Sequence, residues 1–174
     1  VSDFAYGAIG FDGNQPLSFL QTAGAKSVGI ETYTFSKTFN MAGWRVGFAV
    51  GNADMIAALN LIQDHLFVSI FPAIQDAAIA ALAQRKQRTD AVGQLQAVYE
   101  SRRNAFINAV RSFNWEPYVP KGAFYVLMPV PKGYTSAQFA ELLLNRANVA
   151  VADASGFGDA GEGYVRVGLT ITED

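Results

Sequence analysis

Two short segments in the first third of the chain carry the residues that strands favour. Residues 27–35 are rich in β-branched and aromatic side chains, and residues 44–50 alternate in a similar way. The polar, glycine-ended segment 36–43 joins them and is too short for the helical crossover that parallel neighbours need. The pattern therefore predicts two antiparallel strands with a reversal of the chain between them.

Apolar residues then recur at helical spacing. Asn52 supplies an N-cap, which predicts a helix that ends near Leu66. Pro72 suits the first position of a second helix, and the pair Thr89–Asp90 suits the cap of a third helix that ends near Phe113. The middle of the chain is therefore expected to be helical.

The last part of the chain alternates between strand and helix patterns. We predict strands at 123–128, 149–152 and 164–170, and a helix at 136–147. Such alternation is typical of a small α/β unit. The change of pattern places a domain boundary in the helical stretch between residues 84 and 102.

Composition excludes several classes of function. The chain has 174 residues, 51% of them hydrophobic, which is enough for a substantial core. A net charge of -2, without a basic stripe, argues against nucleic acid as a partner. No apolar run is long enough to span a membrane, and no signal-peptide pattern opens the chain. We therefore expect a cytoplasmic protein without membrane contact.

Metal and thiol chemistry are also not expected. The chain has no cysteine, and its single histidine, His65, falls on a predicted helix where a surface position is the simplest interpretation. The two ends suggest a piece of a longer protein. Val1 begins what reads as the end of a buried strand, and residues 172–174 resemble the start of a helix.

One lysine stands among residues that can bind phosphate. Lys37 follows an apolar strand, with Thr34 and Ser36 expected on one strand face before it and Arg45 eight residues after it. Two hydroxyls and a guanidinium fork can bind one phosphate if the loop folds back, for which Gly43 supplies freedom. Singly, each residue has a common structural explanation. Their combination favours a phosphate site.

The segment Thr34–Gly47 closely resembles the lysine signature of class I and II aminotransferases, which use pyridoxal 5'-phosphate (PLP). It has hydroxyls one and three residues before the lysine, an arginine eight after it and a glycine ten after it. The resemblance implies that Lys37 is the catalytic residue that bonds to PLP and shuttles protons. It also implies that Thr34, Ser36 and Arg45 bind the cofactor phosphate.

Two other segments resemble parts of the same family. Asp3 and Tyr6 match a pair that lies beneath the cofactor, which implies that Asp3 binds the ring nitrogen and Tyr6 the ring oxygen. Without the family, these residues are an ordinary cap and an ordinary core tyrosine. The segment 156–168 resembles the one whose arginine binds the substrate α-carboxylate, so Arg166 inherits that role. Residues 153–155 depart from the Pro-Gly that relatives often carry there.

The resemblance covers essentially the whole chain and implies an α/β fold of the aspartate aminotransferase type. Residues 1–90 would form the C-terminal part of the large PLP-binding domain, with a mixed sheet. Residues 91–174 would form the small C-terminal α/β domain without its last helix. Family members are longer homodimers, so a homodimer is implied and the isolated piece is expected to be inactive.

The likeness is strongest to the bacterial subgroup of alanine, diaminopimelate and methionine aminotransferases, on residues 3–51 and 63–66. It implies amino-group transfer between a neutral amino acid, such as methionine or an alanine-like one, and a 2-oxo acid. Carbon-sulfur lyases, aminocyclopropane-carboxylate synthases and decarboxylating relatives share the lysine segment and remain alternatives. Some transcription regulators carry an aminotransferase-like effector-binding domain, a further alternative, which retention of Arg166 disfavours.

Overall fold

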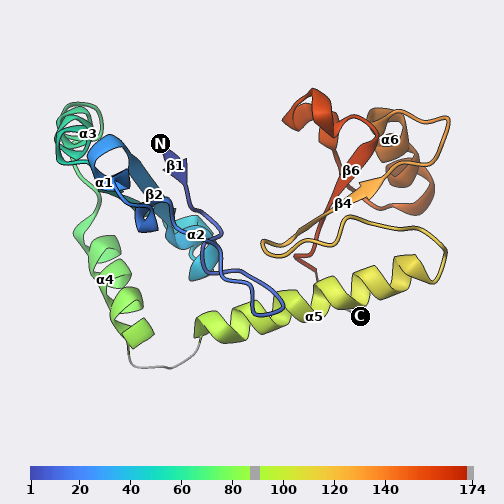
Figure 1. The fold of residues 1–174 in the computed structure, drawn as a ribbon, viewed down its shortest axis with the longest axis horizontal. Helices are drawn as coiled ribbons and strands as arrows, with labels where there is room; N and C mark the ends of the chain where they lie inside the picture. The colour runs from blue at the N-terminus through green and yellow to red at the C-terminus, as the bar shows by residue number, and fades with distance from the viewer. Residues whose placement is uncertain (87–90, 172–174) are drawn as a thin grey trace. The chain divides into compact units, whose positions relative to one another are not determined.

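The computed structural model describes residues 1–86 and 91–171 (Figure 1). The chain divides into two compact units, Val1–Gln96 and Ala97–Asp174, each described by itself below. Both contain helices and a sheet, as an α/β fold requires. The assignment of residues 1–90 and 91–174 to a large and a small domain stays a prediction.

A mixed three-stranded sheet forms the centre of the first unit (Figure 1). Its strands are β1 (Ser2–Asp3), β2 (Ile30–Thr34) and β3 (Gly47–Gly51). The middle strand β2 pairs parallel with β1 and antiparallel with β3. The predicted antiparallel pair is therefore confirmed, in a register that places Thr34 opposite Gly47.

The connection between β2 and β3 is more structured than the loop that the sequence predicts. It contains the short helix α2 (Phe35–Thr38) and the 3-10 turn η2 (Ala42–Trp44). Asn40 and Arg45 each adopt a φ of 53°, in the left-handed region. Gly43, expected to supply the freedom to turn, has no positive φ. The left-handed positions in this reversal of the chain are therefore held by Asn40 and Arg45 and not by a glycine.

The helices of the first unit follow the sequence pattern. Asn52 caps α3 (Ala53–Leu66), and its Oδ1 accepts a hydrogen bond of 2.9 Å from the Met55 N–H. The helix α4 (Pro72–Lys86) starts at the expected proline. Two shorter elements were not expected, α1 (Ala25–Val28) and the 3-10 turn η1 (Phe19–Gln21).

A small aromatic core holds α2 in place. Phe35 and Val46 are buried with Ala78 of α4, and the rings of Phe35 and Phe39 stack with centroids 5.3 Å apart. The Phe35 N–H also donates to the Val46 carbonyl oxygen at 3.2 Å. Burial of one such aromatic side chain contributes about 1.5–3 kcal/mol. This core fixes the backbone on either side of Lys37.

The second unit contains an antiparallel sheet in the order β4-β6-β5. Its strands are β4 (Tyr125–Pro129), β5 (Ala152–Asp153) and β6 (Tyr164–Gly168). The long helix α5 (Ala91–Arg111) ends close to the predicted residue, whereas its expected cap at Thr89–Asp90 lies outside the described residues. The predicted strand at 149–152 shares only Ala152 with the two-residue strand β5.

The helix α6 (Ser136–Ala147) of the second unit has the predicted bounds. It begins with a capping box, in which the Thr135 hydroxyl accepts from the Gln138 N–H and the Gln138 side chain accepts from the Thr135 N–H. It packs against β5 and β6 and buries Phe139. These contacts tie the helix to the sheet.

The two faces of the second sheet differ. Val126, Met128 and Val165 are at most 2% exposed, and the register places Met128 opposite Val165. Leu127 lies opposite Arg166, and because side chains alternate along a strand both point to the other face. Leu127 is 38% exposed. Arg166 is therefore on the more open face.

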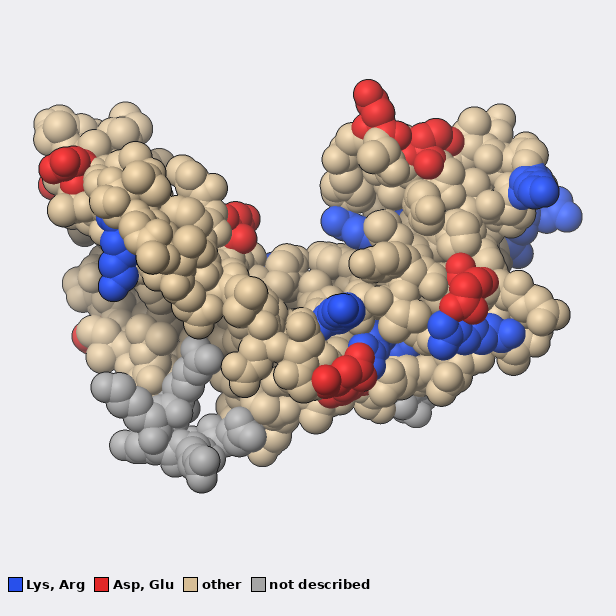
Figure 2. Space-filling view, viewed as in Figure 1, with Lys and Arg blue, Asp and Glu red and all other residues tan. Residues whose placement is uncertain are grey.

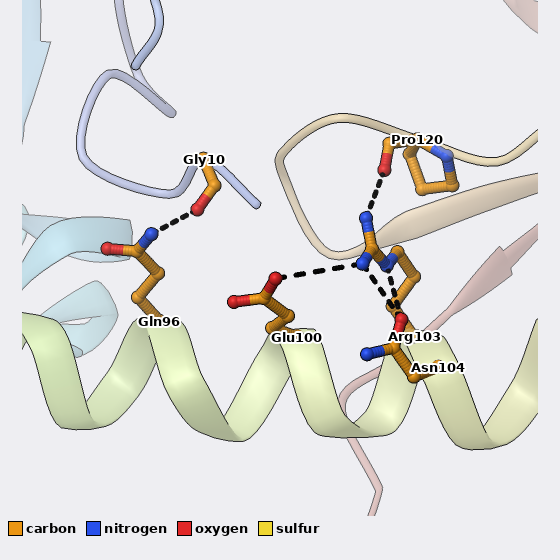
Figure 3. A network of polar contacts seen from close by, with 6 residues as sticks. All are labelled: Gly10, Gln96, Glu100, Arg103, Asn104 and Pro120. Atoms are coloured by element: carbon orange, nitrogen blue, oxygen red, sulfur yellow. Dashed lines mark hydrogen bonds and ion pairs between the residues drawn. The ribbon is translucent and has the colours of Figure 1, made fainter. Parts of the chain in front are cut away.

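A buried arginine anchors the segment that leads into β4. Arg103 of α5 is 2% exposed and donates to the Pro120 carbonyl oxygen at 3.0 Å and to the Asn104 side chain (Figure 3). Its charge is balanced by Glu100 at 3.7 Å. A buried guanidinium is tolerated only when it is paired in this way.

Candidate functional site

The residues predicted to bind phosphate surround a small hollow at the ends of β2 and β3. This β2–β3 hollow has a volume of about 200 Å³ and is lined by Thr34, Ser36, Arg45, Val46 and Gly47. Two residues with hydroxyls and one with a guanidinium thus border a single space. Such donors are well suited to an anion with several oxygen atoms.

The local sequence explains where the two hydroxyls lie. Thr34 ends β2 and caps α2, because its Oγ1 accepts the Ser36 N–H at 3.1 Å. Ser36 therefore lies in the first turn of α2 and not on a strand. The two hydroxyls meet at the hollow through this strand-to-helix turn, whereas the sequence pattern suggested one strand face.

Backbone conformation positions the guanidinium. Arg45 has φ 53° and ψ 43°, a left-handed conformation that costs a residue with a side chain about 1–2 kcal/mol. Its Nη1 donates to the Ala42 carbonyl oxygen at 3.1 Å. The next residues resist rearrangement, because Val46 is buried and a Cβ at Gly47 would lie 2.4 Å from the Tyr33 carbonyl oxygen.

The predicted catalytic lysine lies beside the predicted tyrosine. Lys37 is half-buried on α2, and its Nζ is 6.0 Å from the centroid of the Tyr6 ring. This is the outer limit of a cation–π contact. Neither residue lines the β2–β3 hollow. The structure therefore brings Lys37 and Tyr6 together as one group, with Ser36 linking Lys37 to the hollow along the chain.

Asp3 is placed by backbone pairing. It lies opposite Thr32 in the parallel β1–β2 pair, and the following Phe4 N–H donates to the Thr32 carbonyl oxygen at 2.9 Å. The Asp3 side chain is exposed. It is not among the residues that line the hollow. The role of Asp3 at the cofactor ring, like the other predicted site roles, remains a prediction.

Sequence reasoning missed the carboxylate that holds β1 in place. Glu31 is fully buried in β2 and accepts hydrogen bonds from the Ser18 hydroxyl, the Phe19 N–H, the Ser2 hydroxyl and the Tyr33 hydroxyl. Burial raises its pKa, but the four hydrogen bonds outweigh burial and hold the pKa below its ordinary value. The sequence signal that could have identified Glu31 is an acidic residue within an otherwise apolar strand pattern.

The predicted substrate-binding arginine lies in the second unit. Arg166 is half-buried on β6, the central strand of the sheet. Its guanidinium carbon is 4.2 Å from the Tyr125 ring centroid and 3.9 Å from that of Phe157. These two aromatic residues were not identified from the sequence.

Residues 1–86 and 91–171 hold no group of three or more His, Cys, Asp or Glu residues placed to bind a metal ion. None of the helices within those ranges is long and apolar enough to cross a membrane. His65 is exposed on α3, with Nδ1 2.8 Å from the Leu61 carbonyl oxygen. Basic and acidic side chains are scattered over the face in Figure 2.

The curated relatives of the chain include two proteins that are named as aminotransferases. The chain is 62% identical over all 174 residues to L-glutamine--4-(methylsulfanyl)-2-oxobutanoate aminotransferase of Bacillus subtilis, and spans 43% of that protein. It is 46% identical over 172 residues to LL-diaminopimelate aminotransferase of Dehalococcoides mccartyi, covering 99% of the chain and 44% of the relative. The chain thus spans less than half the length of these curated relatives.

Solved structures also superpose on nearly the whole chain. The apo-BacF structure from Bacillus subtilis superposes with a TM-score of 0.92 at 43% identity, covering 98% of this chain and 43% of that one. A mutant aspartate aminotransferase of Thermus thermophilus gives a TM-score of 0.89 at 28% identity, covering 99% and 44%. The family model described as aminotransferase class I and II matches residues 1–174. The chain therefore belongs to the class I and II aminotransferases, a PLP-dependent family.

Proposed function

We propose that the full-length protein is a PLP-dependent aminotransferase that moves an amino group between a neutral amino acid and a 2-oxo acid. The observation that carries the proposal is the β2–β3 hollow, which is lined by Thr34, Ser36 and Arg45, with Lys37 next to Ser36 in α2. The 62% identical relative is named for 4-(methylsulfanyl)-2-oxobutanoate, the 2-oxo acid of methionine. Methionine is therefore the amino acid we favour.

The chain offers residues that fit the cofactor. When bound, PLP supplies an aldehyde that captures an amine and a protonated ring that draws electrons from the substrate α-carbon. The hydroxyls of Thr34 and Ser36 and the guanidinium of Arg45 provide donors for its phosphate in a hollow of about 200 Å³. Charge-assisted hydrogen bonds of this kind are about twice as strong as neutral ones.

Lys37 has two roles in the proposal. Its Nζ would hold the cofactor at rest and, as a free amine, would move the proton from the substrate Cα to the cofactor, as amino-group transfer requires. The small core around Phe35 fixes the α2 backbone that carries the Lys37 side chain. The centroid of the Tyr6 ring lies 6.0 Å from this Nζ.

Asp3 and Tyr6 would hold the cofactor ring. Asp3 would keep the ring nitrogen protonated, and the Tyr6 hydroxyl would donate to the ring oxygen. Glu31 supports both indirectly, since it receives hydrogen bonds from Ser2, beside Asp3 on β1, and from residues of η1. We assign Glu31 a structural role.

Arg166 would bind the substrate α-carboxylate. A guanidinium can make two parallel hydrogen bonds to a carboxylate, which fixes the orientation of the bound amino acid. The full-length protein would act as a cytoplasmic homodimer, and the 174-residue piece alone would be inactive. The alternatives with the same lysine segment differ in product, so an assay can distinguish them.

The test uses purified full-length protein with PLP. We expect methionine to yield its 2-oxo acid together with amination of an added 2-oxo acid, and Lys37→Ala to lose turnover by at least about 1,000-fold, in line with loss of an essential catalytic group. His65→Ala, on the exposed surface of α3, is the matched control and should keep wild-type activity. Product formation without amination of any acceptor would instead identify a lyase.

A further inference from the structure

Two aromatic rings enclose the guanidinium of Arg166. The guanidinium carbon is 4.2 Å from the centroid of Tyr125 and 3.9 Å from that of Phe157. Both distances are well within the range of about 6 Å for cation–π contacts. An arginine beside one ring is common, whereas contact with two rings from different elements restricts the side chain on more than one side.

The fold brings the two rings together from separate segments. Tyr125 lies opposite Gly168 on β4, so it is a diagonal neighbour of Arg166 on the same face of the sheet. Phe157 ends the 3-10 turn η3 (Ala154–Phe157). Asp153 caps this turn, because its Oδ1 accepts the Ser155 N–H at 2.8 Å. The segment that departs from the family pattern thus delivers one of the rings.

The guanidinium nitrogens of Arg166 keep their hydrogen-bonding capacity. Within residues 1–86 and 91–171, the structure shows no hydrogen bond or ion pair to the Arg166 side chain. An arginine offers five N–H donors in the plane of its guanidinium, and contacts with aromatic rings occupy none of these donors with a hydrogen-bond acceptor atom. The arrangement therefore suits a ligand with two acceptor oxygens in one plane, which is a carboxylate.

We propose that Tyr125 and Phe157 are positioning residues that hold the guanidinium of Arg166 for the α-carboxylate of the substrate. This inference rests on the proposed function, since Arg166 is the carboxylate-binding residue there. The rings act before substrate arrives, by restricting a flexible side chain to orientations that a carboxylate can meet with both oxygens. Their loss weakens carboxylate binding without removing a group that takes part in the reaction.

The experiment measures binding and turnover in full-length protein with PLP. The probe for binding is 4-methylpentanoate, a carboxylate without the amino group needed for reaction, titrated by calorimetry. Phe157→Leu and Tyr125→Leu should each raise its Kd, and the KM for methionine, about 10-fold, whereas kcat changes less than about 2-fold. Phe157→Tyr and Tyr125→Phe keep a ring and should restore Kd to within about 2-fold of wild type.

A second probe separates positioning from general damage. The amine 3-(methylsulfanyl)propylamine resembles methionine without its carboxylate, so its binding should be unchanged in both leucine variants. Equal weakening of both probes would overturn the proposal, because the rings would then support the site as a whole. Loss of 4-methylpentanoate binding in the ring-retaining variants would overturn it as well.

The substitution Arg166→Met separates a failure of this inference from a failure of the proposed carboxylate site. Strong loss of 4-methylpentanoate binding in Arg166→Met, together with wild-type binding in the leucine variants, would overturn only the role of the rings. Unchanged binding in Arg166→Met would overturn the carboxylate site and the inference together. The assignment of Lys37 would be unaffected by either outcome, because it is tested by turnover of Lys37→Ala.

Discussion

The buried carboxylate of Glu31 gives the sharpest prediction about stability. It is fully buried and accepts four hydrogen bonds, two at each oxygen. In Glu31→Gln the amide oxygen can still accept the Phe19 N–H, and the Ser18 and Tyr33 hydroxyls can turn to accept from the new NH2 group. The variant therefore loses mainly the charge on the acceptor, which we expect to lower the free energy of unfolding by about 1–2 kcal/mol.

The substitution Glu31→Leu removes every acceptor. It would leave a backbone N–H and three hydroxyls to find other partners, and we expect a loss of about 3–5 kcal/mol. Urea unfolding of the full-length protein, followed by circular dichroism and by tyrosine fluorescence, measures both changes. Glu141→Gln, an exposed acid on α6, is the matched control and should change stability by less than about 0.5 kcal/mol.

The lowered pKa of Glu31 fixes the sign of the pH dependence. A carboxylate whose pKa is lower in the folded state than in the unfolded state stabilises the protein above its unfolded pKa. This contribution is lost as pH falls through the folded pKa. The advantage of wild type over Glu31→Gln should thus be full at about pH 7 and shrink below about pH 4. An equal advantage at both pH values, or Glu31→Leu as stable as wild type, would refute this reasoning.

Three further substitutions test the candidate site in the full-length protein. Gly47→Ala should destabilise the β2–β3 pair by about 1–3 kcal/mol in urea unfolding, because the new Cβ would lie 2.4 Å from the Tyr33 carbonyl oxygen; unchanged stability would contradict the close approach of these two strands. Arg45→Met should raise the Kd for PLP by at least about 10-fold in equilibrium dialysis, with little effect on folding, and an unchanged Kd would remove Arg45 from the phosphate site. Asn52→Ala should cost about 1 kcal/mol of stability through loss of the α3 cap and leave the Kd for PLP unaltered, whereas an altered Kd would link α3 to the site.

Local signals predicted much of the fold. The cap at Asn52 and the proline at position 72 act within a few residues, so the starts of α3 and α4 follow from short segments of sequence. The antiparallel pairing of β2 and β3 followed from the length of their connection. These features depend on neighbours along the chain.

Features that depend on distant residues were not predicted. Asn40 and Arg45 adopt left-handed conformations in a connection whose residues Phe35 and Val46 are packed in a core, and the sequence suggested Gly43 in their place. Glu31 finds its partners through residues far from it in sequence. The resemblance to the family supplied the candidate site residues, whereas the β2–β3 hollow and the rings around Arg166 required coordinates.

The central claim is that Lys37 is the lysine that bonds to PLP. Full-length protein is loaded with PLP and reduced with borohydride, which makes the bond permanent, and its peptides are then mapped by mass spectrometry. We predict one pyridoxyl group, carried by the peptide that contains Lys37, and none in Lys37→Ala. A label on Lys26 or another lysine, or equal labelling of the Lys37→Ala variant, would contradict this assignment.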